Sequence, residues 1–258
     1  MLIKLLKYEF KSSARTFGLV YLAIFALCVL NGILSHFNQS SVGETVQGIA
    51  ATALIFFAAA AFLINIVLSI NRFGKGVYRD EGYLLHTLPV RADQILAAKL
   101  IPATLWSIAT GLVMLVSVFL LCLIAGEVTL SEAGDTIRIL WNTMLDSNGW
   151  MTVLLTLLML VQFLLQVYAS IALGNLFQKH KSGISVVIFF AFYILQSEIL
   201  VLLGHPYLSV SATSFLITSS EDFSASSLPL ADMAYLLVWS VISWVITQLV
   251  LSKKLNLE

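Results

Sequence analysis

Long apolar runs alternate with short polar segments along this chain. Six runs hold about 20 or more residues each, enough to cross a hydrocarbon core of about 30 Å as helices rising 1.5 Å per residue. Backbone groups inside lipid must be hydrogen-bonded internally, so isolated apolar runs of this kind fold as helices. The pattern predicts an all-α integral membrane protein with six transmembrane helices, at about residues 17–36, 46–71, 100–124, 150–177, 184–203 and 232–251.

Composition supports this prediction. Of the 258 residues, 59% are hydrophobic and 11% are charged, whereas soluble domains carry roughly 25% charged residues. The two cysteines, Cys28 and Cys122, lie inside predicted spans and are expected to be small buried hydrophobes. They indicate neither a disulfide framework nor a metal site.

Basic residues are concentrated in alternate connecting segments. Thirteen of the fourteen Lys and Arg residues lie before span one, between spans two and three, between spans four and five, or after span six, and Arg138 is the exception. Cationic loops are retained in the cytoplasm. The distribution therefore predicts a protein of the cell membrane with both termini cytoplasmic and with extracytoplasmic segments at 126–148 and 205–231.

The first 16 residues are expected to form a short interfacial helix. At 100° per residue its lysines share one face and its leucine, isoleucine and phenylalanine side chains occupy the other, a pattern typical of helices that lie on anionic lipid. Glu9 falls on the apolar side. Two interpretations of Glu9 remain open, a carboxylate at the edge of the buried face or a contact to a partner chain.

Span four carries polar and small residues at a strict spacing of four, which places them on one helix face. This stripe consists of Gln162, Gln166, Ser170 and Gly174. Polar and small residues of this kind commonly pack and hydrogen-bond between membrane helices. Lining a substrate path is the alternative interpretation.

Glu198 is the only acidic residue in the interior of a predicted span, since Asp232 lies at the first position of its span, and this makes Glu198 a functional candidate. It lies 17 residues beyond Lys181, or roughly 26 Å along a helix, and therefore near the outer edge of the membrane. Apolar residues follow it. We therefore expect a helix break at Gln196–Glu198 and a short re-entrant helix on the outer side.

Catalytic and metal-binding motifs are absent from the sequence. It contains no G-x-x-x-x-G-K-[ST] phosphate-binding loop, no H-E-x-x-H, no C-x-x-C and no G-x-S-x-G. The sequence indicates no enzymatic activity, no bound metal and no nucleic-acid partner for this chain.

The segment 79–99, between spans two and three, is charged, interrupted by proline and amphipathic. Its acidic residues lie where a helix dipole favours them, three leucines fall on one side, and the proline ends the helix. So short a helix needs a surface to pack on, and its acidic pair disfavours anionic headgroups. We expect a docking surface for a cytoplasmic partner that includes Asp80, Glu81, Gly82, Tyr83, Leu84, Leu85, Leu88 and Pro89.

At these residues the chain resembles the permease subunits of ATP-binding cassette (ABC) exporters, in the ABC type-2 permease family. That family's pattern is an acidic residue, a glycine, a leucine-proline pair and a lysine that opens the third span. Here these are Glu81, Gly82, Leu88, Pro89 and Lys99. The N-terminal "KYEFK" at 7–11 resembles the family's elbow helix.

The resemblance implies one transmembrane permease domain over residues 1–258, with an elbow helix at 1–16 and a cytoplasmic coupling helix within 79–99. It implies a second permease chain, identical or homologous, and a cytoplasmic ABC ATPase subunit that binds ATP and Mg. The cargo would be a peptide, an antibiotic or a lipid-linked molecule. Two other interpretations stay open, a non-transporting scaffold or sensor that docks a cytoplasmic partner, and an ion-coupled carrier or small membrane enzyme.

Overall fold

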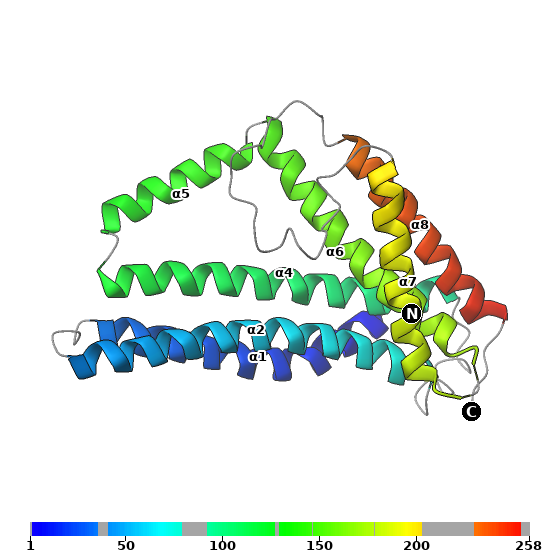
Figure 1. The fold of residues 1–258 in the computed structure, drawn as a ribbon, viewed down its shortest axis with the longest axis horizontal. Helices are drawn as coiled ribbons and strands as arrows, with labels where there is room; N and C mark the ends of the chain where they lie inside the picture. The colour runs from blue at the N-terminus through cyan, green and yellow to red at the C-terminus, as the bar shows by residue number, and fades with distance from the viewer. Residues whose placement is uncertain are drawn as a thin grey trace. The chain divides into compact units, whose positions relative to one another are not determined.

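A computed structural model describes residues 2–35, 41–78, 92–126, 129–145, 147–177, 179–202 and 230–253 of this chain. All of its regular elements are helices (Figure 1), with the bounds α1 Leu2–Ser35, α2 Ser41–Tyr78, α4 Ala92–Ala125, α5 Leu130–Leu145, α6 Ser147–Gly174, α7 Lys181–Leu202 and α8 Leu230–Lys253.

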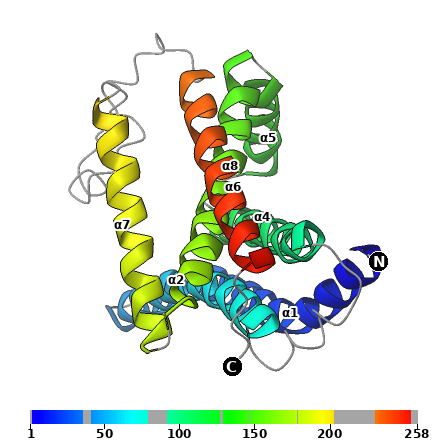
Figure 2. The ribbon, with the colours of Figure 1, turned by 90° about the vertical axis from the view of Figure 1, so that its right-hand side faces the viewer.

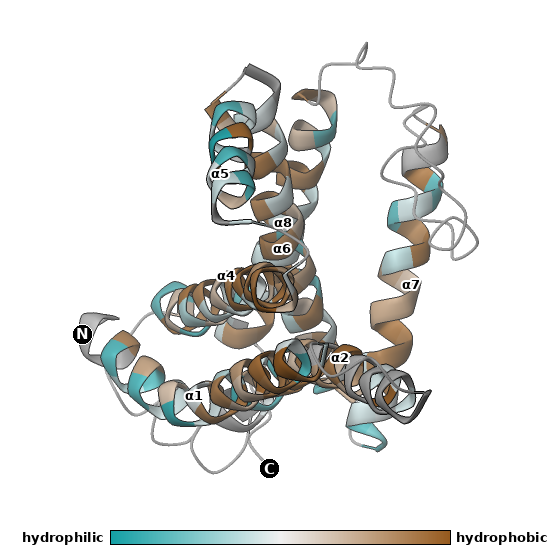
Figure 3. Cartoon of the chain, turned by 90° about the vertical axis from the view of Figure 1, so that its left-hand side faces the viewer, coloured by the Kyte–Doolittle hydropathy of each residue, from teal (hydrophilic) through white to brown (hydrophobic). Residues whose placement is uncertain are grey.

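Six helices in the described part of the chain are long and apolar enough to cross a membrane, namely all of those above except α5. Figure 3 shows long hydrophobic stretches within α1, α2, α4 and α7, whereas α5 contains both hydrophobic and hydrophilic residues. The prediction of an all-helical chain with six long apolar helices is thereby confirmed for the described residues, and these helices fit a multi-pass membrane protein. The helix α5 lies within the polar segment 126–148 and was not predicted.

The N-terminal segment is not a separate helix. One uninterrupted α1 runs from Leu2 to Ser35, so the expected division between an interfacial helix at 1–16 and a span at 17–36 is absent. The physical reason is local. No proline lies in this range, so the backbone hydrogen bonds of the helix can continue through it.

The expected break in the fifth span is also wrong. The helix α7 continues through Gln196–Glu198 to Leu202. Ser197 is accommodated without a break, because its hydroxyl donates to the carbonyl of Ile194 one turn earlier, at 2.8 Å. The expected re-entrant helix falls on residues 203–229, which lie outside the described residues.

The chain divides into two compact units. The first comprises Met1–Arg72 and Ala97–Gly149, and the second comprises Phe73–Leu96 and Trp150–Glu258. The helices α2 and α4 each contribute to both units, and each unit is described by itself below.

In the first unit, α1, α2 and α4 lie side by side (Figure 1). In successive contacts between α1 and α4, the residue numbers increase along both helices. They join Phe17 to Trp106, Tyr21 to Thr110, Cys28 to Ser117 and Gly32 to Ile124. The two helices are therefore parallel, as expected for the first and third of consecutive spans.

In the second unit, α6 and α8 lie side by side (Figure 2), and the hydroxyl of Ser240 on α8 donates to Gln162 on α6 at 2.9 Å. The helix α7 approaches α6 closely at Gly174. A Cβ atom on this glycine would lie only 2.0 Å from the hydroxyl oxygen of Ser185, so the small residue permits the approach.

Candidate functional site

Most of the expected coupling surface lies outside the described residues. This applies to Asp80, Glu81, Gly82, Tyr83, Leu84, Leu85, Leu88 and Pro89, so their predicted docking role stays a prediction. The structure does place Lys99, the remaining coupling residue, in the second turn of α4.

Lys99 forms an ion pair with Glu9 within the first unit. Its Nζ contacts Oε1 of the glutamate, and the two side chains are only 8% and 14% exposed. Arg72 on α2 lies on the other side of the carboxylate, with 3.6 Å between its Nη1 and Oε2 of Glu9. The carboxylate that the sequence placed on an apolar helix face is therefore balanced by two cations of the same chain.

Ser13 completes this group. It lies one turn after Glu9 on the same face of α1, is buried, and donates its hydroxyl to the carbonyl of Glu9 at 2.7 Å. Arg72 Nη1 donates to the same carbonyl at 3.1 Å and to the Ser13 hydroxyl. We call Glu9, Ser13, Arg72 and Lys99 the Glu9 cluster. It ties α1, α2 and α4 together by charge-assisted hydrogen bonds, which are stronger than neutral ones.

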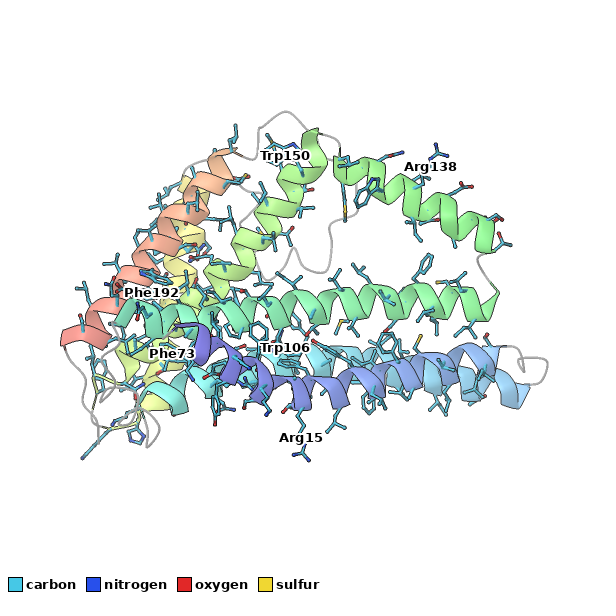
Figure 4. The ribbon with its side chains drawn as sticks, turned by 180° about the vertical axis from the view of Figure 1, so that it is seen from behind. Arg15, Phe73, Trp106, Arg138, Trp150 and Phe192 are labelled. Carbon is cyan, nitrogen blue, oxygen red and sulfur yellow. The ribbon has the colours of Figure 1, made fainter. Side chains whose placement is uncertain are left out.

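A group of aromatic side chains on α1 and α4 lies next to the Glu9 cluster. Trp106, two turns beyond Lys99 on α4, stacks on Phe17 with ring centroids 4.7 Å apart. Phe10 and Tyr21 each lie 6.3 Å from the same indole, and Figure 4 shows the Trp106 side chain between the ribbons of α4 and α1. The cluster therefore adjoins an apolar layer, where ionic contacts are screened less than in water.

The stripe on α6 is buried in the second unit. Gln162, Gln166 and Ser170 are each at most 5% exposed. The side-chain oxygen of Gln162 accepts from Ser240, and the Ser170 hydroxyl donates to the carbonyl of Val167 in its own helix at 2.7 Å. Together with the close approach at Gly174, this burial favours the interpretation that the stripe packs helices together.

Part of the same stripe also borders a cavity. A space of about 140 Å³ lies among α6, α7 and α8, and its lining includes Gln162 and Gln166 but not Ser170. The side-chain nitrogen of Gln162 is buried and has no hydrogen-bond partner among the described residues. These two observations support the alternative interpretation, that the stripe lines a substrate path, at Gln162 and Gln166 only.

Several polar residues of this region were not predicted to belong to a site. Tyr193, Gln196 and Ser197 of α7 line the cavity. Their spacing of three and four residues places them on one helix face, and this spacing is visible in the sequence. On α8, buried small polar residues recur at a similar spacing, at Ser240, Ser243 and Thr247.

Glu198 has no part in either group. Its side chain is exposed and does not line the cavity, although Gln196 and Ser197 beside it do. A carboxylate on an exposed helix face is better suited to water than to proton relay through a packed bundle. Among the described residues, no group of three or more His, Cys, Asp and Glu side chains is arranged to hold a metal ion.

Comparisons with known proteins identify no relative: no family model, no curated protein and no solved structure matches this chain.

Proposed function

We propose that this chain is the membrane-spanning subunit of an ABC exporter of the type-2 permease family. In this proposal it moves its cargo across the cytoplasmic membrane with energy from ATP hydrolysed by a separate cytoplasmic subunit. Two permease chains pair, and each engages one ATPase through the segment 79–99.

The observation that carries the proposal is the ion pair between Glu9 and Lys99. These two residues come from the two segments in which the sequence resembles the family, "KYEFK" at 7–11 and the pattern that runs from Glu81 to Lys99. They are 90 residues apart in the chain. A contact between the two segments suits a device in which movement of the coupling segment is passed to both α1 and α4.

The mechanism needs only rigid helices and one moving attachment point. Segment 79–91 joins the end of α2 to the start of α4. A partner that pulls on this segment would act on α2 and α4 directly and, through the Glu9 cluster, on α1 as well. Nucleotide-dependent contacts would then favour one of two arrangements of the helices over the other. ATP and Mg belong to the partner in this scheme.

Isolation of the chain from its native membrane in mild detergent provides the first test. The proposal predicts that an ATPase subunit co-purifies and that reconstituted vesicles show ATP-dependent transport. A partner that binds without any change in ATP turnover on addition of cargo would instead identify a scaffold or sensor and would contradict transport.

The substitution Leu85→Asp tests the coupling segment. A charge among the docking leucines should remove co-purification of the ATPase, or at least uncouple ATP turnover from transport, because it exposes a carboxylate to an apolar contact. His86→Asp is the matched control, since position 86 falls on the opposite side of the predicted helix. Equal behaviour of the two variants, with transport intact in both, would remove the coupling-helix claim.

A further inference from the structure

The helix α5 is strongly amphipathic, although it is the one described helix that is too short and too polar to span a membrane. At 100° per residue its apolar residues fall within an arc of roughly 140°. These residues are Leu130, Ala133, Ile137, Leu140, Trp141, Met144 and Leu145. Glu132, Asp135 and Arg138 lie on the other side. Ile139 is the exception, an apolar residue on the polar side.

The start of α5 is fixed by a capping box, so the helix has a defined register. The backbone N–H and the hydroxyl of Thr129 both donate to Oε2 of Glu132, each at 2.8 Å. The Glu132 N–H lies 3.4 Å from the Thr129 hydroxyl. The backbone hydrogen bond and then the hydroxyl lower the pKa of Glu132 below its usual value. The carboxylate is held ionised at the helix N-terminus, where the helix dipole favours it.

The chain itself leaves most of the apolar face of α5 uncovered. Ile137 is 56% exposed, and Trp141, Met144 and Leu145 are also exposed, while Ala133 at the start of the helix is buried. Large side chains exposed together along one helix face indicate a surface that another phase or another molecule covers.

The short links that join α5 to α4 and to α6 limit where the apolar face of α5 can lie. The apolar stretch of α4 ends at Ala125 and that of α6 begins at Gly149, so α5 lies between two consecutive spans. At about 3.5 Å per residue, Leu130 lies within about 18 Å of the end of one span and Leu145 within about 14 Å of the start of the next. A helix of 16 residues is about 24 Å long. Both ends are tethered to one side of the membrane, and a helix about 24 Å long cannot stand upright on tethers of this length.

We propose that α5 is an interfacial anchor, which lies along the membrane surface where α4 ends and α6 begins and inserts Ile137, Trp141 and Met144 into lipid. Tryptophan favours this depth, and Trp150, near the start of α6 and labelled in Figure 4, is a second exposed tryptophan that follows α5 in the chain. The ligand is the interface of neutral phospholipids, because two carboxylates and one cation on the polar face give no attraction for anionic headgroups. The anchor would hold residues 130–145 along the membrane surface.

Two isoleucines of the same helix provide a matched test. Ile137 and Ile139 are similarly exposed, at 56% and 64%, but they lie on opposite faces. Single cysteines at 137 and 139 would be introduced into the full chain after Cys28→Ala and Cys122→Ala, labelled with a nitroxide, and studied in phosphatidylcholine nanodiscs. The proposal predicts that the label at 137 collides preferentially with oxygen and the label at 139 with a water-soluble nickel complex, a difference of several-fold in the accessibility ratio.

The pair Met144→Cys on the lipid face and Thr143→Cys on the water face repeats the test farther along the helix. One poorly folded variant then does not decide the outcome. Nickel accessibility at all four positions would overturn the proposal, because α5 would then lie in water. Protection of 137 and 144 from both reagents would overturn it in favour of a protein cover, such as a second copy of the chain. Insertion only after phosphatidylglycerol is added would overturn the assignment to neutral lipid.

Discussion

Two polar groups, one in each unit, join helices by different chemistry. In the first unit the Glu9 cluster uses full charges, one carboxylate between two cations, close to the ends of its apolar stretches. In the second unit the stripe on α6 uses only amides and hydroxyls, and Gln162 lies near the middle of the stretch Gly149–Gly174. Ionic groups become more expensive toward the centre of a bilayer, whereas amides and hydroxyls can be paired there at moderate free energy.

Position along a span therefore decides which polar chemistry can join helices. Near a span end a charge is tolerated if its partner comes from another helix, and the resulting contact depends strongly on that partner. In mid-span the hydrogen bonds are individually weak, and close packing at small residues also holds helices together.

Glu9→Gln should have the largest effect. It leaves two cations of the cluster without a counter-charge, and removing one partner of a largely buried ion pair costs about 3 kcal/mol. Unfolding of the purified chain in mixed detergent micelles would measure this loss. Glu198→Gln is the matched control, because that carboxylate is exposed and its change should stay within about 0.5 kcal/mol. Equal losses in the two variants would contradict the assigned role of the cluster.

Gly174→Ala should have the second largest effect, at the end of the stripe. The new Cβ would lie 2.9 Å from the Cα of Ser185 as well as 2.0 Å from its hydroxyl oxygen. A backbone atom cannot move aside cheaply, so we expect a destabilisation of about 2 kcal/mol. Gly18→Ala on α1 adds its Cβ to open space and should be neutral or stabilising by about 0.5 kcal/mol. The same unfolding assay compares them, and an unaffected Gly174→Ala chain would show that α6 and α7 are not closely packed there.

Ser240→Ala should have the smallest effect, in mid-span. It removes the donor to the side-chain oxygen of Gln162, and hydrogen bonds between membrane helices contribute about 0.6 kcal/mol on average. A double-mutant cycle with Gln162→Leu would isolate this coupling. Thr156→Ala is the control on α6, since that exposed hydroxyl donates only to Thr152 of its own helix. Additive effects of Ser240→Ala and Gln162→Leu would show that the two helices are not joined at this point.

The helices were largely predictable because the membrane imposes a strong and local constraint. A run of about 20 apolar residues has few alternatives to a helix in lipid, so the six apolar runs were found from the sequence. The stripe on α6 was equally predictable, because residues four apart lie on one face of any α-helix. These residues are Gln162, Gln166 and Ser170. Its burial against α8 depends on which helices neighbour it, and the sequence does not state this.

Contacts between distant residues were the part that could not be predicted. Glu9 could be placed on the apolar side of its helix, but its pairing with Lys99 depends on α1 and α4 lying side by side. The break expected at Gln196–Glu198 was wrong for a different reason. A charged residue does not interrupt a helix when its backbone bonds are intact and its side chain reaches an exposed face. The helix α5 was not predicted, because the prediction for segment 126–148 used its polar composition and not the helical periodicity of its apolar residues.

The stacking of Trp106 on Phe17 gives this protein a built-in optical reporter. Trp106 is one of five tryptophans, and its indole nitrogen is buried between α1 and α4. If the other four are replaced by phenylalanine, the emission wavelength and quenching of the remaining indole would follow the separation of these two helices in real time. Such a signal would reveal, without any attached dye, whether the first and third spans move apart during a working cycle.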